Sequence, residues 1–290
     1  MQIAIIGCGE VGGAYARALN SQAALSLCDI LLTGRPRALA DELALELHAA
    51  PGGWLRACDI AIAAVPGRAS PEAASAALPF MAGKSLYIDV STGAPDALRA
   101  SSETFSAKGC GFVDVAIMGA IALTGGATPV LIAGAGAEQA RKPFGLMGAK
   151  VEILADGKPG DAVALKLLRS VIVKGLECLS IESLTAAECL GVRERLFDVL
   201  GDFDRSPMAE FMGALVKTHI LHAERRMHEM EESAAQLRAL GFDAAVTSAL
   251  AERYAATLKA RENDPPAADT HETLDKALSW LVKAGQTKPL

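Results

Sequence analysis

A glycine-rich segment near the N-terminus carries the most specific chemical signal in the sequence. Gly7, Gly9 and Gly12 have the spacing G-x-G-x-x-G, between an apolar run and a stretch with helical periodicity. The first glycine permits a tight turn, the second lets the backbone approach a pyrophosphate, and the third allows close helix packing. The free N–H groups of the helix N-terminus favour an anion. A chance cluster of glycines is the alternative, which this context disfavours. The expected cofactor-binding residues here are Gly7, Cys8, Gly9, Glu10, Val11 and Gly12.

The residues after the second apolar run bear on which dinucleotide binds. An acidic residue at the tip of the second strand accepts hydrogen bonds from a ribose 2'-hydroxyl, whereas arginine pairs with a 2'-phosphate. Thr33 is followed by Arg35 and Arg37, and we expect Asp29 to lie within the strand rather than at its tip. The pattern favours NADP over NAD, with Thr33 and Arg35 as cofactor contacts. The alternative is that both arginines are solvated surface charges.

The elements that must position this loop alternate along the first 155 or so residues. Several apolar runs lack polar alternation, as is typical of parallel strands covered on both faces. Strands are expected at 2–6, 26–33, 60–65, 85–90, 111–115, 129–133 and 150–154, and helices at 11–20, 37–48, 71–80 and 95–107. This alternation predicts an α/β domain of the Rossmann type, with a doubly wound, mainly parallel sheet.

The pattern changes after the turn-forming cluster at residues 157–160. Residues 161–190 form one expected helix, whose charges at Lys166, Arg169, Lys174 and Glu177 argue against a membrane span. A second long helix is expected to end near Leu240. We therefore predict a dinucleotide-binding domain at 1–158 and an all-helical domain for substrate binding and dimerisation at 159–290.

Composition narrows the classes of function. The chain has 290 residues, 51% of them hydrophobic, and a formal net charge of -6. A chain without a basic field is not expected to bind nucleic acid. Its six cysteines contain no C-x-x-C pair, as expected of reduced thiols, and no secretory signal or membrane span is evident. We expect a cytoplasmic protein that binds a small-molecule substrate and contacts no membrane.

Four segments, in order, resemble the superfamily of 3-hydroxyisobutyrate dehydrogenase and 6-phosphogluconate dehydrogenase. The first is the glycine loop, and the second, residues 88–95, is similar to the D-x-S-T-x-x-P segment beside the nicotinamide. Residues 112–120 stand where the family has its D-A-P-V-S-G-G substrate loop. Residues 160–170 resemble the G-x-G-x-x-x-K-x-x-x-N motif that opens the interdomain helix. The resemblance covers the whole chain, closely to about residue 175 and loosely beyond.

This resemblance implies that Lys166 is the catalytic residue. Exchange of hydride with nicotinamide requires an acid or base at the substrate oxygen, and a partly desolvated lysine can serve as either. Composition alone would make a helical lysine a surface residue. The resemblance further implies cofactor contacts at Val65, Pro66 and Thr92 and substrate contacts at Ser91, Met118, Gly119 and Ala120.

Two departures from the family motifs concern the substrate. Ser170 replaces the asparagine, and we expect Arg169 or Lys174 to supply the missing polar contact, so that all three are candidate substrate-binding residues. An intrahelical pair between Lys174 and Glu177 is the structural alternative. Met118 replaces a serine that would hold a carboxylate, which predicts a substrate with an apolar or bulky part.

The second long helix holds three of the five histidines. By comparison with the family, His228 stands where a lysine reaches the cofactor, and Arg225 one turn earlier is a candidate contact for an anionic substrate. A metal site at His219 and His222 is disfavoured because spacing fixes no third ligand, so no metal is expected. A solvated, salt-bridged helix face is the main alternative.

These inferences predict an NADP-dependent oxidoreductase that exchanges hydride with a beta-hydroxy acid or a related alcohol and carbonyl pair, with Lys166 as general acid and base. NAD is the alternative cofactor. The alternative functions are an imine reductase-like enzyme and a non-catalytic NADP-binding regulatory protein. The family resemblance also implies a homodimer or higher homo-oligomer.

Overall fold

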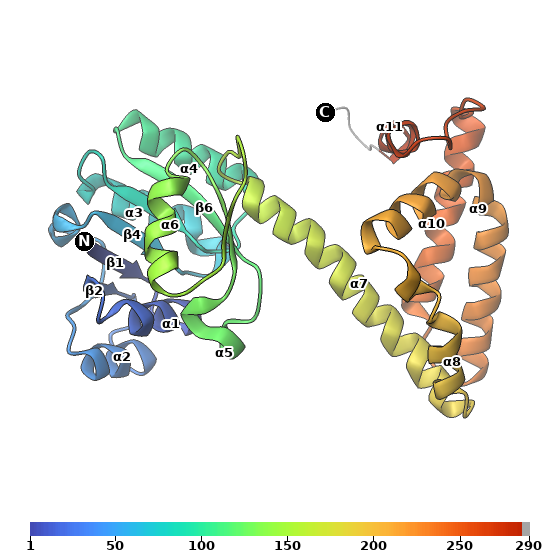
Figure 1. Ribbon diagram of the computed structural model, residues 1–290, viewed down its shortest axis with the longest axis horizontal. Coiled ribbons are helices and arrows are strands. Elements are labelled where there is room, and N and C mark those ends of the chain that lie inside the picture. Colours follow the sequence, from blue (N-terminus) through green and yellow to red (C-terminus); the bar gives the residue numbers. More distant parts are fainter. Residues whose placement is uncertain (286–290) are drawn as a thin grey trace. The chain divides into compact units, whose positions relative to one another are not determined.

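The computed structural model describes residues 1–285. The chain divides into two compact units, the first ending at Val171 and the second beginning at Ile172. The division falls inside the long helix α7 (Asp161–Cys189), coloured yellow-green in Figure 1. The predicted boundary at residues 158 and 159 stays a prediction about where the functional domains divide.

The first unit is built on one eight-stranded sheet, in the order β3-β2-β1-β4-β5-β6-β7-β8. Neighbouring strands are parallel except β6 and β7, which are antiparallel. The strands are β1 (Gln2–Ile6), β2 (Ala24–Cys28), β3 (Leu47–His48), β4 (Ile60–Ala63), β5 (Leu86–Asp89), β6 (Gly111–Ile117), β7 (Val130–Ala133) and β8 (Val151–Ile153). The predicted α/β Rossmann-type fold is therefore confirmed.

Helices cover both faces of this sheet. The helices are α1 (Glu10–Leu19), α2 (Arg35–Leu43), α3 (Ser70–Ala77), α4 (Pro95–Ala107), α5 (Ile121–Thr124) and α6 (Ala137–Leu146). Side chains of α1, α2 and α6 join one buried cluster, and those of α3, α4 and the start of α7 join the cluster on the other face. Central strands such as β4, with all four side chains buried, are apolar throughout because neither face meets water.

Two predicted elements were wrong in their bounds. The second strand was expected at 26–33, but β2 ends at Cys28 because Asp29 turns the chain, its Oδ1 accepting a hydrogen bond from the Leu31 N–H at 2.8 Å. The helix expected at 37–48 ends at Leu43, since Ala44 adopts a left-handed conformation (φ 52°). Residues 47–48 then pair with β2 as the short edge strand β3.

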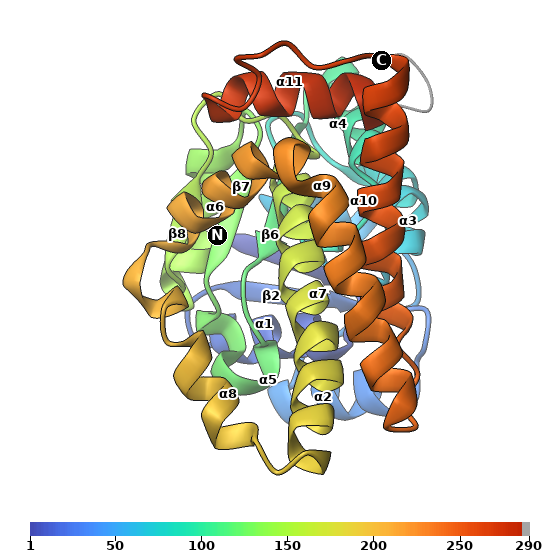
Figure 2. The ribbon, with the colours of Figure 1, turned by 90° about the vertical axis from the view of Figure 1, so that its right-hand side faces the viewer.

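The second unit is helical, as predicted. It contains the rest of α7, followed by α8 (Arg193–Leu200), α9 (Met208–Ala239), α10 (Ala245–Asn263) and α11 (Leu274–Gly285), labelled in Figure 2. Small buried clusters join α7 to α9 through Ala186, Ala234 and Leu237, and α9 to α11 through Ile220 and Trp280. No helix within residues 1–285 combines the length and apolarity that crossing a bilayer demands.

A carboxylate of α7 holds α10 in place within the second unit. Glu182 accepts hydrogen bonds from the backbone N–H groups of Val246 and Thr247, at 2.8 and 3.0 Å, and from the Thr247 hydroxyl at 2.6 Å. These N–H groups belong to the first turn of α10, which has no other side-chain cap at its N-cap residue. Glu182 therefore satisfies helix donors that would otherwise lack partners.

Candidate cofactor and substrate site

The glycine loop has the geometry that its spacing predicts. Gly7 follows β1 with φ +90°, and a Cβ there would lie 2.5 Å from the Ala64 carbonyl oxygen. A Cβ on Gly12 would overlap the carbonyl oxygen of Gly7, whereas one on Gly9 would meet no atom within 4 Å. The turn and the helix packing thus need glycine, while the space above Gly9 is open at the N-terminus of α1. This arrangement fits a pyrophosphate held by backbone N–H groups.

Cys8 contributes to this loop through its backbone and not through its thiol. Its N–H donates to Asp29 Oδ2 at 2.7 Å, while its buried Sγ lies 3.7 Å from the Cys28 carbonyl oxygen. Burial, aided by the negative charge of Asp29, raises the pKa of the Cys8 thiol to about 12. The thiol is therefore protonated at neutral pH and takes part in no chemistry of the loop.

The tip of β2 differs from the sequence-based expectation. Asp29 was expected inside a strand, but it is the first residue beyond β2, the position from which an acid reaches a ribose hydroxyl. The chain continues through Ile30, whose side chain is 90% exposed, to the exposed Thr33 and Arg35. Arg37 donates to the Leu32 carbonyl oxygen at 3.4 Å. An acid and an arginine thus both lie in the segment that discriminates NAD from NADP.

A cavity of about 220 Å³ opens at the carboxyl ends of the central strands. Five of its lining residues were predicted site residues, namely Val11, Val65, Ser91, Thr92 and Lys166. The sequence analysis did not name Ala64, Gly67, Val90 or Ile117 as site residues, although Val90 and Ile117 lie inside the family segments 88–95 and 112–120. The cavity lies wholly within the first unit, where crossover connections of parallel sheets form ligand sites.

Lys166 is half-buried in the wall of this cavity. Its Nζ donates a hydrogen bond to the hydroxyl oxygen of Thr92 at 3.0 Å. Burial lowers the pKa of Lys166, and the negative charge of Asp114 opposes that change. A lysine whose pKa is lowered toward the working pH can donate and accept a proton in the same cycle.

Ser91 is fixed by backbone contacts at the same edge of the sheet. Its Oγ accepts a hydrogen bond from the Val65 N–H at 3.2 Å, and its own N–H donates to Asp89 Oδ1 at 2.8 Å. Asp89 also accepts a hydrogen bond from the Ser70 hydroxyl at 2.6 Å. Burial raises the pKa of Asp89. Ser91 thereby joins the ends of β4 and β5, while its predicted role in substrate binding stays a prediction.

The segment expected to form the substrate loop follows β6 directly. Met118 is partly buried against the cluster that contains Ala116 and Leu131, and it does not line the cavity, although its neighbour Ile117 does. Gly119 and Ala120 are exposed in the connection to α5, and Pro66 is exposed after β4. The roles predicted for these four residues stay predictions.

The other predicted substrate residues lie on α7 and α9. Arg169 and Ser170 belong to the first unit, one turn beyond Lys166. Lys174, Arg225 and His228 belong to the second unit. Arg225 pairs with Glu229, and His228 Nδ1 lies 3.0 Å from Glu231 Oε2, so both form contacts along α9. Their predicted contacts with ligands stay predictions.

His219 belongs to a cluster on α9 and α10 that spacing alone did not indicate. Its Nε2 lies 2.8 Å from the Thr257 hydroxyl oxygen, and its ring stacks on Tyr254 with 5.0 Å between centroids. Burial, together with the charges of Arg253 and Arg226, lowers the pKa of His219. Within residues 1–285 no three His, Cys, Asp or Glu side chains gather as metal ligands would.

Together, the crossover topology, the glycine loop and the cavity beside it place the first unit in the class of NAD(P)-binding oxidoreductases. The chain belongs to the family described as "NAD binding domain of 6-phosphogluconate dehydrogenase", whose model matches residues 2–154. A second model, a domain of unknown function designated DUF1932, matches residues 187–257 in the helical unit. The predicted resemblance to this superfamily is confirmed.

Relatives with known sequences and structures share this organisation. An uncharacterized 28.5 kDa protein from Methanothermus fervidus is 24% identical over 232 residues, covering 80% of this chain and 89% of the relative. A conserved protein of unknown function, described as structurally similar to 3-hydroxyacid dehydrogenases, is 28% identical with a TM-score of 0.61. That match covers 90% of this chain and 98% of the other.

Two more distant structures share the fold. A variant imine reductase from Myxococcus stipitatus, in complex with NAD+, has a TM-score of 0.73 at 17% identity, covering 96% of this chain and 98% of the other. A reductive aminase from Aspergillus terreus, in complex with NADPH, has a TM-score of 0.68 at 18% identity, covering 94% and 98%. The protein thus has an NAD(P)-binding, hydroxyacid dehydrogenase-like fold.

Proposed function

We propose that this protein is an NADP-dependent oxidoreductase in which Lys166 is the general acid and base for a hydroxyl and carbonyl pair. The observation that carries the proposal is the half-buried Lys166 amine, held by Thr92 in a cavity that the glycine-loop helix also lines. A reduced nicotinamide, when bound, supplies the hydride for the carbonyl carbon. The Lys166 ammonium donates its proton to the substrate oxygen, and the neutral amine accepts a proton in the reverse direction.

The other residues of the cavity position the reactants and exclude water. The glycine loop would hold the pyrophosphate through its open backbone at Gly9. Val65, Val90 and Ile117 give the cavity apolar walls, in which the charge of Lys166 is poorly screened. An apolar wall also supports the expectation that the substrate, a beta-hydroxy acid or related compound, carries an apolar part.

Replacing Lys166 tests the proposed acid. Lys166→Met should lower turnover by about 100- to 10,000-fold while NADPH binding, followed by its fluorescence, stays within about threefold of the wild type. Lys158→Met is the matched control, because Lys158 precedes the same helix but does not line this cavity. Normal turnover by Lys166→Met on any aldehyde or keto acid that the wild type reduces would refute the role.

Imine reduction is the second candidate, favoured by the largely apolar cavity walls and by the shared fold with imine reductases. The Lys166→Met variant separates the two reactions, since reduction of an iminium ion needs no proton from Lys166. Retained activity on cyclic imines, with loss of activity on carbonyl compounds, would identify the imine as a substrate class. NADPH binding without turnover across the whole panel would favour the regulatory alternative.

The choice of NADP rests on Arg35, which lies at the start of α2 and is exposed. Arg35→Ala should raise the KM for NADPH by about 10- to 100-fold, the effect of losing a charge-assisted hydrogen bond, and should leave the KM for NADH nearly unchanged. Arg37→Ala serves as control, because Arg37 already bonds to Leu32. Equal effects on both cofactors would refute the assignment of NADP through Arg35.

We also propose that the protein is a homodimer through its helical unit. Apolar side chains of α8, the following turn and α9 are exposed, among them Phe197 at 51%, Val199 at 74%, Phe203 and Met208. Such surface is rarely left open to water in a stable monomer. A second copy of this chain, offering the same side chains, would bury it.

A further inference from the structure

Two fully buried carboxylates lie side by side at the carboxyl edge of the sheet. Asp89 ends β5 and Asp114 lies in β6, and the two residues are paired in the parallel register. Neither has exposed surface. Residues in register on parallel strands point to the same face, here the face covered by α4 and the start of α7. Buried acids are costly unless they are bonded, so each needs a structural reason.

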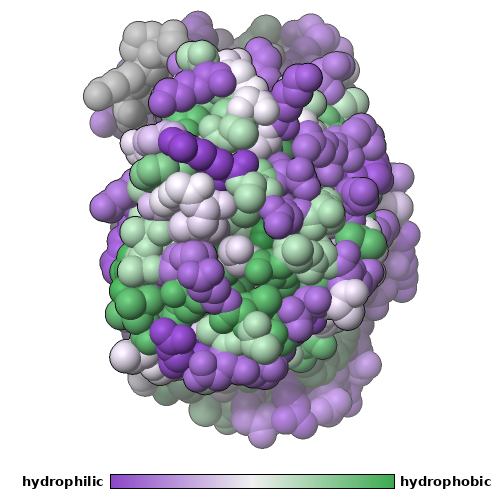
Figure 3. Space-filling view, turned by 90° about the vertical axis from the view of Figure 1, so that its left-hand side faces the viewer, coloured by the Kyte–Doolittle hydropathy of each residue, from purple (hydrophilic) through white to green (hydrophobic). Residues whose placement is uncertain are grey.

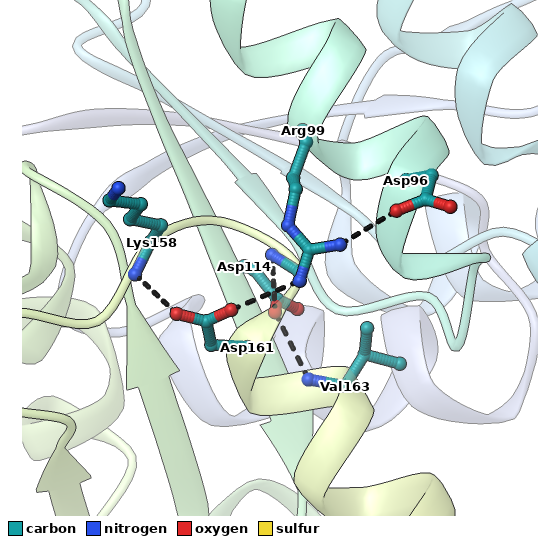
Figure 4. A network of polar contacts seen from close by, with 7 residues as sticks. Asp96, Arg99, Asp114, Lys158, Asp161 and Val163 are labelled. Carbon is teal, nitrogen blue, oxygen red and sulfur yellow. Dashed lines mark hydrogen bonds and ion pairs between the residues drawn. The ribbon is translucent and has the colours of Figure 1, made fainter. Parts of the chain in front are cut away.

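The bonds of Asp114 reach a distant part of the chain. Its Oδ2 accepts hydrogen bonds from the backbone N–H groups of Gly160 and Val163, both at 3.0 Å, across more than 45 residues of sequence. Figure 4 shows the Asp114 carboxylate beside the first turn of α7, with a dashed line to the Val163 N–H. Asp114 therefore caps α7 from inside the sheet, and Val163 lies three residues before Lys166 on that helix.

The second carboxylate oxygen of Asp114 is free. Within residues 1–285, Oδ1 is buried without a hydrogen-bond partner. Burial raises the pKa of Asp114 to about 6, and the negative charge of Asp89 acts in the same direction. The hydrogen bonds from the backbone N–H groups of Gly160 and Val163 lower this pKa. Burial lowers the pKa of Lys166, and among the charged groups of residues 1–285 it is Asp114 that raises this pKa.

A second, only partly buried carboxylate binds the chain just before this turn. Asp161 accepts a hydrogen bond from the Lys158 N–H at 2.8 Å and pairs with Arg99 at 3.1 Å, and Arg99 also pairs with Asp96 at 2.7 Å (Figure 4). Asp161 thus bonds to the turn that leads into α7, whereas the fully buried Asp114 also accepts a bond from an N–H group of the first turn of α7. Its charge does not shift the pKa of Lys166. Comparing variants of Asp114 and Asp161 therefore separates the loss of backbone hydrogen bonds near the start of α7 from the loss of the charge that influences Lys166.

We propose that Asp114 is a positioning residue for Lys166: it holds the first turn of α7 against the sheet and places a buried negative charge at that turn, three residues before Lys166 on the helix. The inference rests on the proposed function of Lys166. In carbonyl reduction the ammonium is the form that donates. Asp114 therefore extends the pH range over which the acid is present, without touching the substrate.

Asp114→Asn tests the charge because the amide oxygen can still accept both N–H bonds of α7. The variant should keep the cofactor affinity, while the alkaline limb of kcat for carbonyl reduction moves to lower pH, so that activity at pH 9 falls about tenfold. Asp114→Ala should also lose the cap and raise KM. Asp161→Asn, the control at the same turn, should leave the alkaline limb in place.

A measurement without turnover keeps this inference separate from the proposed function. Titration of Lys166 followed by NMR of its labelled ε-carbon, assigned with Lys166→Met, should show the amine titrating at lower pH in Asp114→Asn than in the wild type. An unchanged titration, or an equal change in Asp161→Asn, would overturn the role of Asp114. If the titration moves but Lys166→Met retains turnover, the coupling stands and only the catalytic role of Lys166 fails.

Discussion

The two units of the chain differ in how their apolar side chains are covered. In the first unit, apolar side chains are buried on both faces of the sheet and polar groups converge at its carboxyl edge. On the face of this unit shown in Figure 3, polar residues gather along the right side and apolar ones at the lower left. In the second unit, α8 and α9 expose many large apolar side chains. The first unit thus contains a cavity lined by its own residues, whereas the second exposes apolar surface on α8 and α9.

Substitutions in the glycine loop should have the largest effect, and they test whether the first unit binds NADPH through this loop. Gly12→Ala places a Cβ against the Gly7 carbonyl oxygen, and the overlap should cost about 1–3 kcal/mol and abolish detectable NADPH binding. Gly9→Ala is the matched control for stability because its Cβ meets nothing within 4 Å. It should unfold as the wild type does and still bind NADPH more weakly, measured by fluorescence titration. If both variants bind NADPH with wild-type affinity, the pyrophosphate does not bind at the glycine loop.

The exposed helices of the second unit should respond next. Phe197→Ser combined with Val199→Ser removes two exposed apolar side chains, each worth about 1–2 kcal/mol at an interface, so the dimer dissociation constant should rise at least about 30-fold. Sedimentation velocity over a dilution series measures this. Leu123→Ser removes a side chain of the first unit that is 85% exposed, and should change nothing. A monomeric wild type would refute the proposed dimer.

A smaller effect should follow from the cap on α10. Glu182→Ala leaves the N–H groups of Val246 and Thr247 without their carboxylate, which should destabilise the second unit by about 1–2 kcal/mol. Faster hydrogen exchange should be confined to α10. Glu188→Ala, which breaks an exposed pair with Arg193, should cost about 0–1 kcal/mol. Equal losses would mean that the cap of α10 is no stronger than a surface pair.

A last effect concerns the pH dependence of stability. The pKa of Asp114 is raised from 3.8 to about 6, chiefly by burial, so the native state binds a proton more tightly than the unfolded chain. Protonation of Asp114 therefore stabilises the folded state at low pH, and this stabilisation is lost as pH rises from about 4 to about 6. Urea unfolding should show this loss in the wild type and a flatter curve in Asp114→Asn. Parallel curves would mean that Asp114 titrates normally in the native state.

Sequence patterns predicted the sheet and the loop because both are local. Gly12 must lack a side chain because a Cβ there would overlap the carbonyl oxygen of Gly7, five residues earlier. Central strands such as β4 are apolar because both faces of the sheet are covered. The tip of β2 was mispredicted for an equally local reason. The apolar run continues through Leu31 and Leu32, but the side chain of Asp29 captures the Leu31 N–H and ends the strand.

The parts of the site that escaped prediction depend on contacts between distant segments. The family motif pointed to Lys166, and the structure places its amine beside Thr92, 74 residues earlier. No pattern near Asp114 indicates that its partners are Gly160 and Val163. Ile117 lines the cavity because β6 ends at this residue, which the sequence pattern did not indicate. Residue types thus indicated the chemistry, and tertiary packing determined which groups influence it.

The thiol of Cys8 has a practical consequence for this protein. Because the Cys8 thiol is buried and protonated, alkylating reagents and peroxides should spare the dinucleotide loop. The exposed Cys178 and Cys189 on α7 should react first. A maleimide dye would therefore label the helical unit selectively, which gives an optical probe of its association that leaves the nucleotide pocket chemically intact.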